Sequence, residues 1–184
     1  MAVSIFEERF KGGHSNSLGN TIEIVDEVLA DKSKLQALVD TWQSEDELVR
    51  LRVANAVRRV CVENPAWIAP YLNHFIGVVA KIDQPSTQWT LAKLFEFLEN
   101  RMGAEQKALA RDHMKYNLAH HKDWIVLNNS METLALWAKT DGNLQDWLKP
   151  QLLRLTEDTR KSVAGRARKL LAVMDKQGKK AAGQ

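Results

Sequence analysis

One apolar pattern recurs four times along the chain, and it constrains the fold more than any other feature. It places apolar or small side chains at positions p, p+4, p+7, p+8 and p+11, which share one face of an α-helix. The four copies are Val49-Val53-Ala56-Val57-Val60, Thr87-Leu91-Leu94-Phe95-Leu98, Leu127-Met131-Leu134-Ala135-Ala138 and Val163-Ala167-Leu170-Leu171-Met174. Their starts are 38, 40 and 36 residues apart. A repeat of this length predicts stacked helical hairpins, each burying its apolar face against the next.

The segments between these copies also repeat, and they complete the predicted helix map. WIAPYL at 67–72 matches WLKPQL at 147–152, with a proline about one turn into each helix that either starts the regular helix or kinks it. An aspartate precedes each second helix and is expected to cap it, and these residues are Asp46, Asp83, Asp123 and Asp158. The predicted helix pairs are 33–43 with 46–62, 66–82 with 85–100, 104–121 with 123–139, and 143–156 with 159–176.

The sequence therefore predicts an all-α protein with one helical-repeat domain over residues 1–176. Two shorter helices, at 4–10 and 21–30, are expected to form an N-terminal cap within residues 1–32, with the repeats over 33–176. Residues 177–184 are rich in lysine and are predicted to be a basic, disordered tail.

The segment from Asp46 to Val57, DELVRLRVANAV, resembles the second helix of a HEAT repeat. Pro70 and Pro150 fit the proline of that family's first helix, and the resemblance covers roughly residues 33–176. The Val49-Arg50 pair is replaced by other residues in the later copies. The resemblance implies a right-handed α-α superhelix, a solenoid of about four helix pairs, whose concave surface is lined by the second helices. It implies binding of other macromolecules rather than one activity.

Side chains at p+2, p+3, p+6 and p+9 point away from the repeated apolar stripe and are predicted to line the concave face. These candidate binding residues are Arg52, Asn55, Arg58, Trp89, Lys93, Asn129, Arg166 and Lys169. Such side chains suit an acidic or phosphate-bearing partner. The alternatives are a solvated face without a partner and, for Trp89, packing between neighbouring repeats.

The longest predicted loop, residues 12–20, is small, polar and rich in hydrogen-bond donors. One interpretation has its backbone N–H groups, His14 or Asn16 contact a ligand. The other is a linker after the first helix, because no Gly-Lys-Ser/Thr phosphate-loop pattern follows.

Catalytic and metal-binding patterns are not found, so the sequence predicts no enzyme, no cofactor and no metal site. His113 and His120 are two helical turns apart, about 10 Å, which is too far for one zinc ion without ligands from another segment. Cys61 is the single cysteine and lies among valines, as a buried core residue would. An enzyme on a helical-repeat scaffold, such as a glycosylase or a chromophore lyase, is a third alternative.

Charge is unevenly distributed along the chain. Residues 160–184 carry a net charge of +7 within a total of +3, so the preceding residues sum to −4. A protein partner is the first expectation, and nucleic acid bound through the basic C-terminal segment is the second. The second alternative resembles, in architecture only, the HEAT-like DNA glycosylases that excise alkylated bases.

No membrane association is expected, and the protein is predicted to be cytoplasmic. The sequence does not indicate an oligomeric state.

Overall fold

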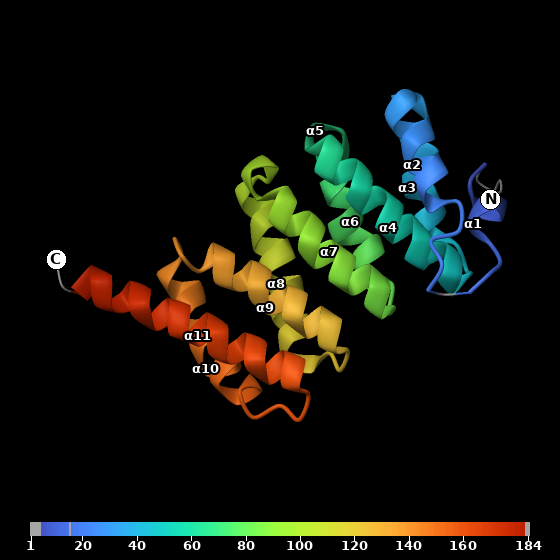
Figure 1. Cartoon of the computed structure of the whole chain (residues 1–184). Helices are drawn as coiled ribbons and strands as arrows, with labels where there is room; N and C mark the ends of the chain where they lie inside the picture. The colour runs from blue at the N-terminus through green and yellow to red at the C-terminus, as the bar shows by residue number, and fades with distance from the viewer. Residues whose placement is uncertain (1–4, 15, 183–184) are drawn as a thin grey trace. The chain divides into compact units, whose positions relative to one another are not determined.

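The chain folds into helices joined by short turns and loops. The computed structural model describes the backbone of residues 5–14 and 16–182 and the side chains up to residue 176. Within these ranges no residue is in a β-strand, which confirms the predicted all-α class (Figure 1). No helix in the described part of the chain is both long enough and apolar enough to cross a membrane.

Contacts along the chain group into two compact units, Met1–Lys107 and Ala108–Gln184. The division falls inside α8 (Ala104–His120). It differs from the single domain over residues 1–176, with an internal boundary after residue 32, that the sequence predicts. The cap is not set apart, because Phe6, Phe10 and Ile24 are fully buried in the same unit as the first repeats.

In the first unit, the long helices lie side by side. Its α-helices are α1 (Glu7–Phe10), α2 (Thr21–Ala30), α3 (Leu35–Asp40), α4 (Glu47–Glu63), α5 (Pro65–Ile68), α6 (Leu72–Gly77) and α7 (Pro85–Phe97). Helix α4 packs against α2 on one flank and α7 on the other (Figure 1). It also contacts α3, α5 and the short 3₁₀ segment η2 (Thr41–Gln43).

The second unit contains most of α8, together with α9 (Trp124–Trp137), α10 (Gly142–Leu155) and α11 (Lys161–Ala182). Helix α11 packs against both α9 and α10. It continues to Ala182, beyond residue 176, where the sequence predicts that the last helix ends. The first six residues of the predicted disordered tail are therefore helical, and its last two lie outside the described residues.

The repeated apolar pattern is buried, as predicted. Of its twenty side chains eighteen are buried, and the other two, Leu170 and Leu171, are half-buried. Trp42 joins the first two copies, because its indole N–H donates to Thr87 Oγ1 at 3.1 Å. Its ring also packs edge-on against the ring of Phe75, with 5.6 Å between the two ring centroids. Burying large rings and aliphatic side chains supplies the main favourable free energy of folding.

The two matching prolines have different effects on their helices. Pro70 lies in a 3₁₀ turn, η3 (Ala69–Tyr71), so the predicted helix 66–82 is split into α5 and α6. Pro150 lies inside α10, which runs without a break.

Two of the four predicted aspartate caps are confirmed. Asp46 accepts from the backbone N–H groups of Leu48 and Val49, and Asp123 caps α9 in the same way. Asp83 is not a cap, because it lies two residues ahead of α7, which begins at Pro85 as predicted and has Gln84 at its N-cap. Asp158 lies three residues ahead of α11 and binds the backbone and guanidinium of Arg160 instead.

Candidate functional site

The eight residues predicted to line one binding face are divided between the two units. Arg52, Asn55, Arg58, Trp89 and Lys93 belong to the first unit, and Asn129, Arg166 and Lys169 belong to the second.

Arg52 is not part of an open surface, which corrects the prediction. Its side chain is buried, with only 3% of the residue exposed. The cause is tertiary packing, because backbone carbonyls between Phe10 and Ser17 meet its guanidinium at a position, p+3, that lies about 85° from the centre of the apolar stripe. Of the other residues at p+3, Thr90 and Ser130 are also buried, whereas Arg166 is half-buried.

The guanidinium of Arg52 holds the loop at residues 12–20 in place. It donates hydrogen bonds to the backbone carbonyls of Phe10, Gly12, His14 and Ser17. The loop thus turns acceptors toward a buried cation, and the prediction that its N–H groups face a ligand is not supported by this arrangement. A guanidinium has five N–H donors, which suits this convergence of carbonyls.

The side chains of His14 and Asn16 are exposed on the outside of this loop. His14 Nδ1 accepts from the backbone N–H of Asn16 at 3.1 Å, which closes a local turn. Because His14 is bonded within the loop, its position is explained by loop structure without any ligand.

Most of the remaining predicted residues already have partners. Lys93 pairs with Glu96 at 2.9 Å, and Arg166 pairs with Glu132. Trp89 and Asn129 are half-buried, and each interacts within the structure. Two of the predicted cations have no such partner among the described residues. Lys169 is exposed on α11, and Arg58 lines an open groove.

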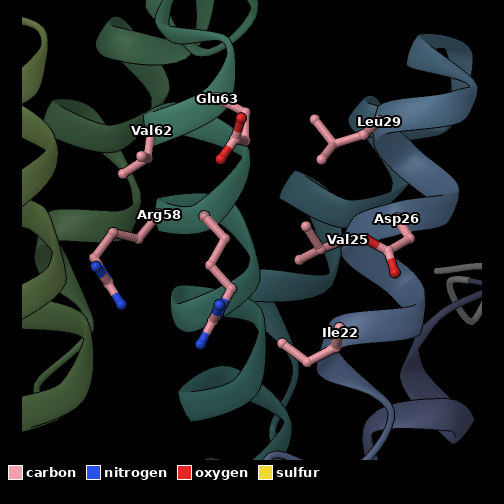
Figure 2. A pocket seen from close by; sticks show the side chains of 8 residues that line it. Ile22, Val25, Asp26, Leu29, Arg58, Val62 and Glu63 are labelled. Carbon is pink, nitrogen blue, oxygen red and sulfur yellow. The ribbon is translucent and has the colours of Figure 1, made fainter.

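This groove lies between α2 and α4 in the first unit and has a volume of about 420 Å³ (Figure 2). It is lined by Ile22, Val25, Asp26, Leu29, Arg58, Arg59, Val62 and Glu63. In Figure 2, Ile22, Val25 and Leu29 extend from α2 toward α4. Ile22 is 39% exposed and Val62 is 55% exposed, so apolar surface on both walls is open to solvent.

Both signs of charge border the apolar walls of the groove. Arg59 is held by Asn55, whose Oδ1 accepts from its Nε at 2.7 Å. Among the described residues none forms a hydrogen bond or ion pair with the side chain of Arg58, which is half-buried. Asp26 and Glu63 supply carboxylates on α2 and α4. The groove can therefore accept an apolar group and place a guanidinium against an anion beside it.

Sequence reasoning missed the α2 wall, although a signal was present. Helix α2 buries Thr21, Ile24, Val25 and Val28. Its sequence, TIEIVDEVLA, also places Ile22, Val25 and Leu29 at i, i+3 and i+7, which makes a second apolar stripe. A short helix with two apolar stripes carries more apolar surface than one neighbouring helix can cover.

Two other titratable groups differ in burial: Cys61 is a buried core residue, and His113 is half-buried on α8. Burial raises the pKa of the Cys61 thiol to about 11, so the thiol is protonated at neutral pH. Burial also lowers the pKa of His113. Over the part of the chain that the structure describes, no group of three or more His, Cys, Asp or Glu side chains could hold a metal ion.

No protein-family model, curated protein or solved structure matches this chain significantly. The resemblance to HEAT repeats therefore stays a prediction from the repeated sequence pattern.

Proposed function

We propose that this chain is a non-catalytic, cytoplasmic binding module that captures an amphipathic segment of a partner protein in the groove between α2 and α4. The observation that carries the proposal is the combination of open aliphatic walls with an Arg58 side chain that has no bonded partner among the described residues. This combination offers burial to apolar side chains and a charged hydrogen bond to a carboxylate in one place.

The dimensions of the groove favour a short helix as its occupant. Helix α2 has ten residues, and so a wall about 15 Å long. A bound helix of about three turns would cover it, with aliphatic side chains at i, i+3 or i+4, and i+7 against Ile22, Leu29 and Val62. An acidic residue on the same helix would then face Arg58.

The same proposal includes a HEAT-like architecture, in which helical hairpins stack into a right-handed superhelix. The repeated pattern at intervals of 36 to 40 residues supports it, and so does the packing of α4 between α2 and α7 within the first unit. Scaffolds of this kind present rows of side chains to extended partners, which agrees with a role in recognition.

Quantitative affinity enrichment tests the proposed function. The full-length chain and two variants, Val62→Glu and Leu153→Glu, would be used to enrich partners from a lysate of the cells that make the protein. Both substitutions put one carboxylate on an exposed apolar position, since Leu153 is 64% exposed and lies in the other unit. The two variants therefore match in the charge that is added and in the exposed, apolar character of the residue that is replaced.

The proposal predicts at least one protein that the wild type and Leu153→Glu retain and that Val62→Glu loses. A charge buried in an apolar contact without a partner costs several kcal/mol, about enough to abolish micromolar binding. Retention of every partner by Val62→Glu, with its thermal stability unchanged, would contradict binding in this groove.

A further inference from the structure

We propose that the exposed face of α11 binds the phosphate backbone of a nucleic acid duplex, independently of the groove between α2 and α4. The inference starts from charge. The second unit carries a net charge of +6, from fourteen Lys and Arg side chains and eight Asp and Glu side chains, whereas the first unit carries −3. A positively charged unit attracts polyanions over distances comparable to the Debye length.

Four cations of α11 are aligned on one side of the helix, and Arg166 lies outside this group. Lys161, Arg168, Lys169 and Lys176 fall within an arc of about 100° at 100° per residue, and we call them the basic stripe. Lys161, Lys169 and Lys176 are exposed, and so is Arg168, which also donates to the backbone carbonyl of Thr156 at 2.6 Å. At a rise of 1.5 Å per residue the stripe is about 22 Å long.

The middle of the basic stripe carries only small side chains, which leaves room for a partner to approach the helix. Between the cations lie Gly165 and Ala172, both exposed. A Cβ placed on Gly165 would meet nothing within 4 Å. The lysine and arginine side chains therefore project beyond a low central strip, and a polyanion can approach the helix closely there.

Neighbouring acidic side chains do not neutralise the stripe. Asp175 pairs with Lys149 at 3.3 Å, Asp158 pairs with Arg160 at 2.6 Å, and Glu132 pairs with Arg166. For Lys161, Lys169 and Lys176 the described residues supply no ion pair. Three cations thus lack an internal counter-ion and can replace the counter-ions condensed on a phosphate backbone.

A duplex suits this surface better than a membrane or a single strand. The apolar face of α11, which includes Val163, Ala167 and Met174, is buried against its own unit and is unavailable for insertion into lipid. Helix α11 contains no aromatic residue on which an unpaired base could stack. A duplex needs neither feature, since it presents about one charge per 1.7 Å along its axis. The recognition would be independent of sequence, because only phosphates are contacted.

Fluorescence anisotropy with a labelled 24-base-pair DNA duplex, titrated with the full-length chain at several salt concentrations, tests this inference. If the four cations of the stripe engage phosphates, log K falls against log salt with a slope of about −3.6. The double substitution Lys169→Gln with Lys176→Gln should reduce the slope by about 1.8. The double substitution Lys81→Gln with Lys139→Gln removes the same charge from exposed positions elsewhere and should leave the slope unchanged.

A second pair of variants adds a charge without removing a cation. Ala172→Glu places a carboxylate in the centre of the stripe and should weaken duplex binding at 0.1 M salt by about tenfold or more. Ala119→Glu, at an exposed position of α8 in the same unit, should weaken it by less than about threefold. Circular dichroism would check that each variant keeps its helix content.

Four outcomes would overturn the inference. They are equal losses in the stripe and control variants, binding that does not depend on salt, no duplex binding at 0.05 M salt, and tighter binding to a single strand or to phosphatidylserine vesicles than to the duplex. Because the groove variant Val62→Glu leaves α11 untouched, it should bind the duplex like the wild type.

Discussion

Arg52 fixes the N-terminal part of the first unit through one buried cation. Four backbone carbonyls from residues 10–17 converge on its guanidinium, so the loop owes its path to a residue more than thirty positions away. Gly19 lies against the same group, because a Cβ there would be 2.9 Å from Arg52 Cζ, and its φ of +52° is left-handed. The close approach of Arg52 and the positive φ both favour glycine at position 19, because glycine has no Cβ.

A pair of glycine substitutions tests this contact. Gly12 also has a positive φ, but a Cβ there meets nothing within 4 Å. We expect Gly12→Ala to lower the free energy of unfolding by about 1 kcal/mol, from backbone strain alone. Gly19→Ala should cost about 2–3 kcal/mol, because the methyl group also displaces the guanidinium. Urea unfolding of both variants measures the difference, and equal costs would mean that Arg52 does not constrain the loop.

At the scale of single helices, sequence and structure agree where the cause is local. Helical periodicity identified the buried stripe of each repeat, because burial of an amphipathic helix follows its own sequence. It failed for Arg52, since the loop that covers this side chain is brought there by tertiary packing. It also failed to find the groove, because the α2 wall depends on which neighbour leaves Ile22 and Val62 uncovered.

The aspartates ahead of the helices also differ, since some of them cap a helix and others do not. Asp46 and Asp123 each accept two backbone N–H groups at the start of a helix, whereas Asp83 accepts none at α7. Asp46→Ala and Asp123→Ala should each cost about 1 kcal/mol, which lowers Tm by about 2–4 °C in a chain of this length. Asp83→Ala should change the free energy of unfolding by less than about 0.5 kcal/mol. A thermal melt that ranked Asp83→Ala with the other two would show that the assigned helix start is wrong.

For the whole molecule, the proposed superhelix makes a prediction about size. A compact globule of 184 residues has a radius of gyration of about 16 Å. A solenoid spreads its mass along one axis, because each repeat contacts only its neighbours. Small-angle X-ray scattering of the monomer should therefore give a radius of gyration clearly above 16 Å, and a value at or below it would count against the superhelix.

The two units also differ in charge, which separates the two proposed binding surfaces. The groove between α2 and α4 belongs to the unit of net charge −3 and combines apolar walls with both signs of charge. The basic stripe on α11 belongs to the unit of net charge +6. One chain could in this way join a protein partner to a polyanion, with each contact removable by its own variants.

Site-specific photo-crosslinking in the producing cells measures the central claim, capture of a partner protein by the groove, most directly. A photo-reactive amino acid would replace Ile22, Val62 or, as the exposed position in the other unit, Leu153. The proposal predicts that the same protein is crosslinked from positions 22 and 62 and is not crosslinked from position 153. Adducts of equal yield from all three positions, or none from 22 and 62, would contradict it.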